Sequence, residues 1–291
     1  MSEVEHILSV HNQLGEGSLW SVDEQALYWV DIERNCFFRL ITATGVYEKI
    51  EVGVAIGVLA LRASGGLVMA TKTGFMLWDN AAKQLRLIAN PEAGRPHLRF
   101  NDGAVDSRGR FWAGSMGGPG EGVLYRLDPD GSVHAMIADI DVPNGLGWSP
   151  DDTIMYFTDS PRQVIYAFDY DAATGNIANR RPFVEVPAHS GSPNGLTVDS
   201  EGYIWSACWD GAKVIRYAPD GRIDRVVEVP ALRTTSCVFG GSHMDELYIT
   251  SATTGLSDEQ LKRYPFSGDL FRLKVDVTGK EKFKFADGML L

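Results

Sequence analysis

The chain is short of the side chains that form many metal centres and nucleophilic sites, with only three Cys and six His among 291 residues. The Cys residues lack metal-type spacing and the His residues form no ligand pair. No G-x-S-x-G, H-E-x-x-H or G-x-G-x-x-G motif occurs. Serine nucleophile catalysis and nucleotide binding therefore have little support. Cys208 and Cys237 lie in apolar runs, which predicts buried free thiols in a reducing compartment, with a disulfide as the open alternative.

Basic charge and long apolar runs are also scarce. Lys and Arg number 27 against 38 Asp and Glu, which gives a net charge of −11. This balance argues against a nucleic-acid partner, because phosphate binding needs clustered cations. No apolar run approaches the ~20 residues of a membrane span, and no signal sequence opens the chain. We therefore expect a cytoplasmic protein with a small-molecule ligand and no membrane partner, monomeric or weakly homo-oligomeric.

What the chain does have is a sixfold repeat of strand-like segments. Each copy begins with a lead residue followed by an apolar run, and the steps between lead residues are 41, 44, 43, 50 and 41 residues. The lead residues are Glu16, Gly57, Asn101, Asn144, Asn194 and Thr235. A period in this range without long helices predicts an all-β, six-bladed β-propeller that forms a single domain over residues 1–291.

The ends of the chain and one long loop complete this prediction. Residues Val4–Val10 and Lys282–Phe285 both have the pattern of strands, and we expect the N-terminal strand to complete the last blade and remove its open edge. The irregular stretch Ala252–Gly268, with a short helix over Leu256–Arg263, could overhang the channel mouth.

Polar residues at the lead positions are the best candidates for a functional site. Equivalent positions in a propeller face the central axis, so one carboxylate and three carboxamides should converge there. Glu16, Asn144 and Asn194 together could bind a hard divalent cation through oxygen. Each also has a structural alternative, since Glu16 could cap a backbone N–H and the two Asn-Gly pairs could form plain turns.

A further pair precedes the third repeat. Arg99 and Asn101 are two residues apart in an extended segment, so both side chains should share one face and could contact substrate hydroxyls or a developing oxyanion. A surface salt bridge is the alternative for Arg99. Asp102 should point to the opposite side and cap a turn.

Taken in order, five motifs make the chain similar, over essentially its whole length, to the gluconolactonase, regucalcin (senescence marker protein) and luciferin-regenerating-enzyme family. They are Gly15–Gly17, Arg99–Gly103, Gly114–Met116, Pro143–Leu146 and Thr234–Gly241. The resemblance implies a six-bladed propeller with one divalent cation (Ca²⁺, Zn²⁺, Mn²⁺ or Mg²⁺) in its central channel. Many members of the family hydrolyse sugar lactones.

The resemblance also implies roles for individual residues. Glu16 and Asn144 correspond to metal ligands, and Arg99 and Asn101 correspond to contacts with substrate hydroxyls. Glu121, in a loop that is shortened here, is the candidate for a further sugar contact. The family usually has an Asp, which ligates the metal and serves as the proposed general base, where this chain has Asn194. Asn194 is therefore the candidate at both the third metal-ligand position and the catalytic position.

The function expected from these residues is metal-dependent hydrolysis of a sugar aldonolactone, gluconolactone-like or pentonolactone, to the aldonic acid, as in carbohydrate metabolism. A carboxamide cannot accept a proton near neutral pH, so metal-bound hydroxide, or a nearby carboxylate such as Asp210, would have to act in its place. Two alternatives are a non-catalytic, divalent-cation-binding protein of the regucalcin type and an organophosphate or ester hydrolase on the same metal site.

Overall fold

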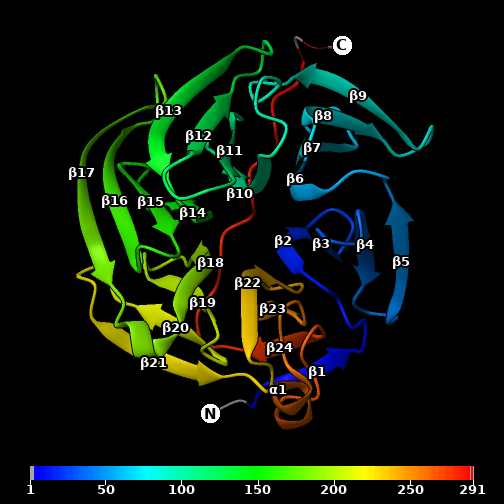
Figure 1. Cartoon of the computed structure of the whole chain (residues 1–291), viewed down its shortest axis with the longest axis vertical. Coiled ribbons are helices and arrows are strands. Elements are labelled where there is room, and N and C mark those ends of the chain that lie inside the picture. The colour runs from blue at the N-terminus through cyan, green and yellow to red at the C-terminus, as the bar shows by residue number, and fades with distance from the viewer. Residues whose placement is uncertain (1–2, 289, 291) are drawn as a thin grey trace.

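Six four-stranded antiparallel sheets surround a central channel in the computed structural model, which describes residues 3–288 and 290 (Figure 1). Blade 1 contains β2 (Gly15–Ser21), β3 (Ala26–Asp31), β4 (Cys36–Ile41) and β5 (Val46–Glu51); blade 2 contains β6 (Ile56–Leu61), β7 (Leu67–Thr71), β8 (Gly74–Asp79) and β9 (Gln84–Ala89); blade 3 contains β10 (Arg99–Val105), β11 (Phe111–Met116), β12 (Gly122–Leu127) and β13 (Val133–Ile140). Blade 4 contains β14 (Pro143–Trp148), β15 (Ile154–Asp159), β16 (Val164–Asp171) and β17 (Asn176–Glu185); blade 5 contains β18 (Ser192–Val198), β19 (Ile204–Trp209), β20 (Lys213–Tyr217) and β21 (Ile223–Glu228), preceded by a 3₁₀ turn at Ala188–Ser190. The predicted six-bladed propeller is confirmed.

The sixth blade is built from both ends of the chain. It contains β22 (Arg233–Gly240), β23 (Glu246–Ala252) and β24 (Leu270–Lys274), and β1 (Glu5–Leu8) pairs with β24 as its outer strand. The buried carboxylate of Asp269 fixes this junction by accepting hydrogen bonds from the backbone N–H groups of Val10 and His11. The prediction that the N-terminal strand closes the ring is thus confirmed, and it leaves the last blade without an open edge.

Apolar side chains between neighbouring blades form the core. The second strands β3 and β7 are buried along their whole length, because each lies within a blade that is stacked between two others. Phe37 of blade 1 packs edge-on against Trp78 of blade 2, with ring centroids 5.8 Å apart. Cys36, Cys208 and Cys237 are buried free thiols, as predicted for the last two.

The six innermost strands share an irregularity near their lead residues. In β2 the pairing with β3 shifts register between Glu16 and Leu19, and β10 shifts between Phe100 and Gly103. The same shift occurs in β6, β14, β18 and β22. A bulge breaks the strict alternation of side chains, so consecutive residues of one inner strand can both face the channel.

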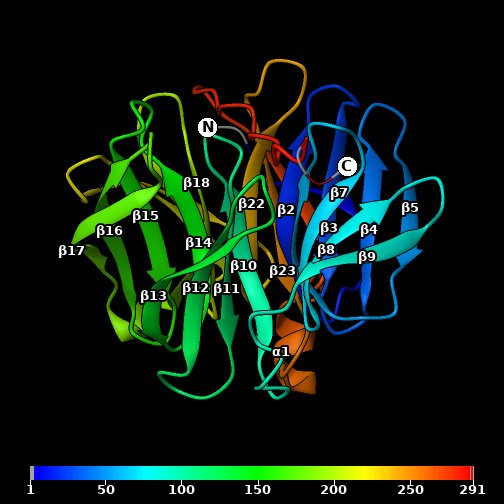
Figure 2. The same ribbon diagram turned by 90° about the horizontal axis from the view of Figure 1, so that it is seen from above.

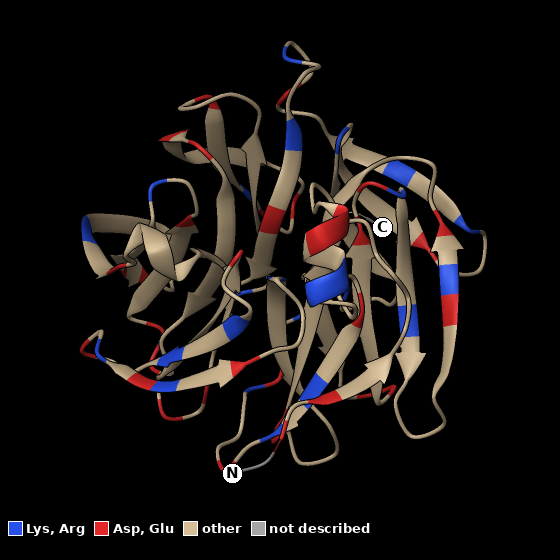
Figure 3. Cartoon of the chain, turned by 60° about the horizontal axis from the view of Figure 1, so that its bottom comes forward, with Lys and Arg blue, Asp and Glu red and all other residues tan. Residues whose placement is uncertain are grey.

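Different segments lie at the two ends of the propeller (Figure 2). The helix α1 (Asp258–Arg263) lies at one end, close to the predicted Leu256–Arg263, and a capping box between Ser257 and Gln260 starts it. Figure 3 shows its acidic first turn and basic last turn, an order that favours the helix dipole. No helix among the described residues is long and apolar enough to span a bilayer.

At the opposite end, the prediction of a strand over Lys282–Phe285 is wrong. These residues form an extended segment that crosses the channel end outside any blade (Figure 1). Phe285 makes a single bridge with Arg62, and Ala286 N–H donates to the carbonyl of Gly109. Polar and apolar residues alternate in this segment because Phe285 is fully buried between blades 2 and 3. The segment itself does not pair within a sheet.

Candidate functional site

Five of the predicted site residues line one cavity of about 440 Å³ at the α1 end of the channel. They are Glu16, Arg99, Asn101, Asn144 and Asn194. The rest of the lining is mostly apolar or hydroxylated and consists of Leu14, Met116, Val142, Ser160, Pro161, Ser192, Trp209 and Asp210. These polar residues lie near the starts of the inner strands β2, β10, β14 and β18. Because all four strands begin at the same end of the channel, residues far apart in the sequence meet in one place.

Hydrogen bonds orient the amide groups in this cavity. Arg99 Nη1 donates to Asn101 Oδ1 at 2.7 Å, and Asn101 Nδ2 donates to Asn144 Oδ1 at 3.1 Å. Asn144 Nδ2 in turn donates to Ser160 Oγ at 2.7 Å, and that hydroxyl donates to the carbonyl of Pro193 at 2.6 Å. This relay across three blades fixes the amide of Asn144 with its oxygen toward Asn101.

Two oxygens of the predicted metal-ligand set are left without strong protein partners. Among the residues that the structure describes, Asn194 Oδ1 is buried and accepts no hydrogen bond, and Glu16 accepts one only from the N–H of its neighbour Gly17, at 3.3 Å. A buried acceptor without a donor is costly, and a divalent cation that prefers oxygen would satisfy both groups. The described residues contain no cluster of three His, Cys, Asp or Glu suited to a metal, so a cation here would depend on amide oxygens as well as on Glu16.

Burial and neighbouring charges act on Glu16 together. Burial raises the pKa of the Glu16 carboxyl well above its ordinary value, and the carboxylate of Asp102 raises it further. The Gly17 N–H and the guanidinium of Arg99 act in the opposite direction. Burial also lowers the pKa of Arg99, while the charges of Glu16 and Glu33 oppose this. The salt bridge to a carboxylate that sequence reasoning allowed for Arg99 is not formed among the described residues.

Glu121 lies apart from this cavity. Its side chain is 46 % exposed on the loop between β11 and β12, where it accepts a hydrogen bond from the N–H of Gly118 at 2.6 Å and contacts His97 at 3.2 Å. It does not line the cavity. Thr235, the lead residue of blade 6, binds the carbonyl of Gly15, so this position supports the backbone and adds no polar atom to the cavity.

Two residues beside the cavity were not expected from the sequence: Trp209, the last residue of β19, and Arg233, the first residue of β22. Asp210, which the sequence offered as a possible proton acceptor, directly follows β19 and has a positive φ of 56° that turns the chain at the cavity wall. Arg233 stacks on Trp209, with its guanidinium carbon 4.5 Å from the ring centroid, and pairs with Asp210 at 2.7 Å. A comparison of the ends of the second strands would have drawn attention to Trp209, but nothing in the sequence indicates the partner of Asp210.

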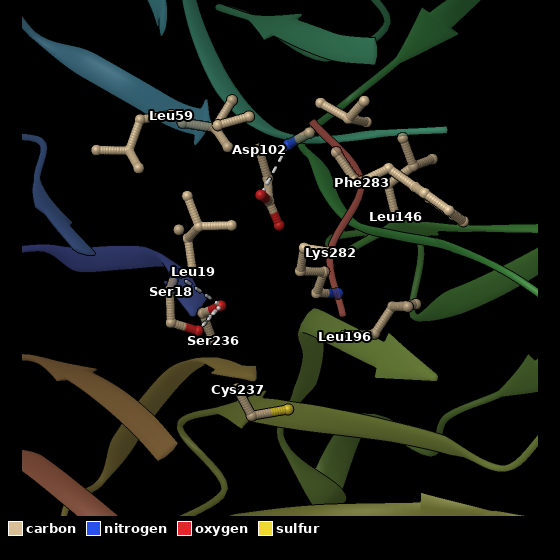
Figure 4. Close-up of a pocket in the computed structure, with 16 residues that line it drawn as sticks. Ser18, Leu19, Leu59, Asp102, Leu146, Leu196, Ser236, Cys237, Lys282 and Phe283 are labelled. Carbon is tan, nitrogen blue, oxygen red and sulfur yellow. Dashed lines mark hydrogen bonds between the residues drawn. The ribbon is translucent and has the colours of Figure 1, made fainter. Parts of the chain in front are cut away.

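A second, much smaller polar chamber of about 40 Å³ lies at the other end of the channel (Figure 4). Asp102 and Lys282 both point into it, together with the hydrogen-bonded hydroxyls of Ser18 and Ser236. Asp102 does accept a hydrogen bond from the N–H of Gly103, but the prediction that it points away from the channel is wrong. The bulge in β10 turns both Asn101 and Asp102 inward.

The fold and the site together define a six-bladed propeller with a cavity at one end of its channel, where a carboxylate, three amides and a guanidinium meet. A family model described as the SMP-30/Gluconolactonase/LRE-like region matches residues 14–253. The chain belongs to this family, which confirms the resemblance found in the sequence.

Relatives and solved structures match along nearly the whole chain. A 6-deoxy-6-sulfogluconolactonase from Pseudomonas putida is 39 % identical, with 94 % of this chain and 95 % of the relative covered. A pentonolactonase from Haloferax volcanii is 36 % identical, with 97 % of each chain covered. The crystal structure of a calcium-binding protein, regucalcin, from Agrobacterium tumefaciens superposes with a TM-score of 0.93 at 30 % identity and covers 96 % of each chain.

Proposed function

We propose that this protein is a metal-dependent sugar lactonase that hydrolyses a gluconolactone-like or pentonolactone substrate to the aldonic acid. The observation that carries the proposal is the convergence, in one cavity, of the Glu16 carboxylate, the unpartnered Asn194 oxygen and the guanidinium of Arg99. Such a site can bind a cation and a hydroxylated ligand side by side. The names of the Pseudomonas and Haloferax relatives, both lactonases, support the same chemistry.

The residues of the chain would divide the work between metal and substrate. Glu16, Asn144 and Asn194 would hold one divalent cation (Ca²⁺, Zn²⁺, Mn²⁺ or Mg²⁺). When bound, this cation would polarise the lactone carbonyl and promote ionisation of a water. Arg99 uses Nη1 for Asn101 and the carbonyl of Phe100, which leaves other guanidinium N–H groups for substrate hydroxyls. Holding the lactone in one orientation lowers the entropic part of the barrier.

Proton transfer is the unusual part of this site. A carboxamide at position 194 has no basic atom near neutral pH, so Asn194 can orient groups but cannot take a proton from water. Asp210 is the other carboxylate that lines the cavity, and it would be the proton acceptor. This arrangement predicts a slower enzyme than one with a carboxylate at 194.

A second candidate function is cation binding without catalysis. The same Asn194 favours it, because the position lacks a base, and the Agrobacterium structure is described as a calcium-binding protein. Organophosphate or ester hydrolysis on the same site is less favoured, because the oriented pair of Arg99 and Asn101 suits a hydroxylated substrate.

Initial rates on a lactone panel separate these functions. We would follow proton release from five- and six-membered aldonolactones, corrected for spontaneous opening, before and after chelation and with each of the four cations added back. Hydrolysis that disappears with chelator and returns with a cation supports the lactonase. Cation binding by calorimetry without any turnover would establish the non-catalytic function, and turnover unaffected by chelation would overturn the metal requirement.

A further inference from the structure

One wall of the cavity carries an ion pair between Asp210, the proposed proton acceptor, and Arg233, which has no part in the proposed reaction. Arg233 Nε donates to Asp210 Oδ1 at 2.7 Å, and its Nη1 donates to the carbonyl of Thr254. The guanidinium also covers one face of Trp209, 4.5 Å from the ring centroid. Arg233 is only 14 % exposed, so its charge is enclosed by a carboxylate, a carbonyl and an indole.

A second arginine next to this wall, Arg162, is also paired with carboxylates. Arg162 follows Pro161 of the lining and contacts Asp139 at 3.0 Å, Asp141 at 3.1 Å and Asp159 at 3.3 Å. Three carboxylates therefore surround the single guanidinium of Arg162. An anionic group on a ligand would have to compete with three aspartates for this one guanidinium.

Within the lining itself, negative charge exceeds positive charge. Glu16 and Asp210 are opposed by Arg99 alone among the described lining residues. Arg99 also lies in the electrostatic field of Glu16 and Glu33. A cation bound at Glu16 would act at the reacting carbonyl, and the wall that includes Trp209 and Asp210 borders the same cavity.

Much of the remaining surface is apolar. Five lining residues, Leu14, Met116, Val142, Pro161 and Trp209, present hydrocarbon or aromatic surface. Trp209 is partly buried and lines the cavity, so the indole surface that it exposes there can contact the C–H groups of a sugar ring. Burying a hydroxyl or a charge against such a surface without a partner is unfavourable.

We propose that Trp209, Asp210 and Arg233 form a specificity wall that selects uncharged lactones with a short or deoxygenated tail and rejects lactones with an anionic tail. The inference rests on the proposed lactonase function and adds the substrate class. It assigns this chain a different substrate from the sulfonated lactone for which its 39 % identical relative is named. Asp210 cancels the only cation that the wall could offer to an anionic tail.

The test uses three six-carbon lactones that differ only at C6, which is a methyl, a hydroxymethyl or a phosphorylated hydroxymethyl group. We expect kcat/KM to be highest for the methyl compound and at least roughly 100-fold lower for the phosphorylated one, because an unpaired charge must be desolvated.

Asp210→Asn frees Arg233, so the preference for uncharged over phosphorylated lactone should fall about fivefold or more. Arg233→Met leaves Asp210 unpaired and should raise that preference. Trp209→Ala should raise KM for the methyl compound more than it lowers kcat.

Asp220→Asn is the matched control, because it breaks an exposed Asp220–Arg222 pair on a distant turn and should leave the preference unchanged. Ratios of kcat/KM cancel any shared loss of turnover if Asp210 also accepts the proton. Equal or better hydrolysis of the phosphorylated lactone by the unmodified protein would overturn the inference while the lactonase function stood. Unchanged ratios in both Asp210→Asn and Arg233→Met would overturn it as well. Inactivity toward all three lactones, with other aldonolactones also inert, would overturn the proposed function itself.

Discussion

The two ends of the central channel are made by the same inner strands yet have opposite characters. At the α1 end, Glu16 and Arg99 border a cavity of about 440 Å³. At the other end, Asp102 and Lys282 border a chamber of about 40 Å³. Each end thus has a buried carboxylate and a cation, but the chamber around Asp102 has room for only a water or two.

The difference between the ends comes from what lies across them. The segment Gly279–Asp287 inserts Lys282 into the channel, where its Nζ contacts Thr197 Oγ1 at 3.1 Å, and buries Phe285 between blades 2 and 3. At the α1 end, the loop from Ala252 to Gly268 supplies the carbonyl of Thr254 to Arg233 but no described residue that lines the cavity. A propeller channel becomes a site at the end that the chain leaves open.

The largest expected effect is a gain in lactone turnover from a substitution at the open end of the channel. Asn194→Asp should raise lactone turnover by roughly 10²–10⁴-fold, the usual worth of general-base assistance, and should tighten cation binding by adding a charge. Initial rates and calorimetric titration measure both. No gain in a protein that is already fast would place the base elsewhere, and a loss of cation binding would remove position 194 from the ligand set.

A change of similar size, but in the free energy of unfolding and not in turnover, is expected at the closed end of the channel. Phe285→Ala removes a fully buried aromatic side chain and should lower the free energy of unfolding by about 3–5 kcal/mol. Cation affinity at the open end should stay within about threefold of the unmodified protein, since Phe285 does not line that cavity. Denaturant titration and calorimetry test the two halves of this prediction. Weakened cation binding in a folded variant would show that the two ends are coupled.

Glu16→Gln should have the next largest effect, and this effect should fall on cation affinity and turnover and not on stability. Glu16 is the sole carboxylate among the proposed cation ligands, so its loss should weaken Ca²⁺ or Zn²⁺ binding by roughly 100-fold and reduce lactone turnover with it. Asn101→Ala is the control, because Asn101 is assigned to substrate and should alter KM or kcat while cation affinity is largely kept. Equal losses of cation affinity in both variants would make Asn101 a ligand.

The smallest expected effect is a pH dependence of stability from the closed end. Burial raises the pKa of Asp102 from 3.8 to about 6. Between these two values the folded protein holds a proton that the unfolded chain has released, so stability falls as pH rises through this window. The change should not exceed roughly 3 kcal/mol. Unfolding curves of the metal-free protein and of Asp102→Asn, compared from pH 4 to 7, should differ in slope only across this range; parallel profiles would contradict the assignment.

Much of this molecule could be predicted from its sequence because propellers repeat. The lead residues Glu16, Asn101, Asn144 and Asn194 share one position in the repeat, and the inner strands bring them to one cavity as expected. The ring closure by the N-terminal strand was predictable for the same reason, since an open edge strand would be unfavourable.

The errors come from features that break the repeat. Two-residue alternation places Asp102 opposite Asn101, and only the bulge in β10 reverses this. Lys282–Phe285 alternates like a strand, but its apolar residues are buried between blades and not in a sheet. The wall formed by Asp210 and Arg233 depends on a positive φ at Asp210 and on a partner 23 residues away, neither of which leaves a trace in the sequence.

The closure of blade 6 by β1 has a consequence for how the protein is made. Asp269 holds the N-terminal residues Val10 and His11 in place, so the first segment to leave the ribosome must wait for almost the last before its sheet is complete. Glu16 enters the chain early, and the blade beside it is finished only when β24 has been synthesised. The open end of the channel therefore gains its final form after translation of nearly the whole chain, and a prematurely terminated chain would have an unpaired sheet edge ready to bind another copy.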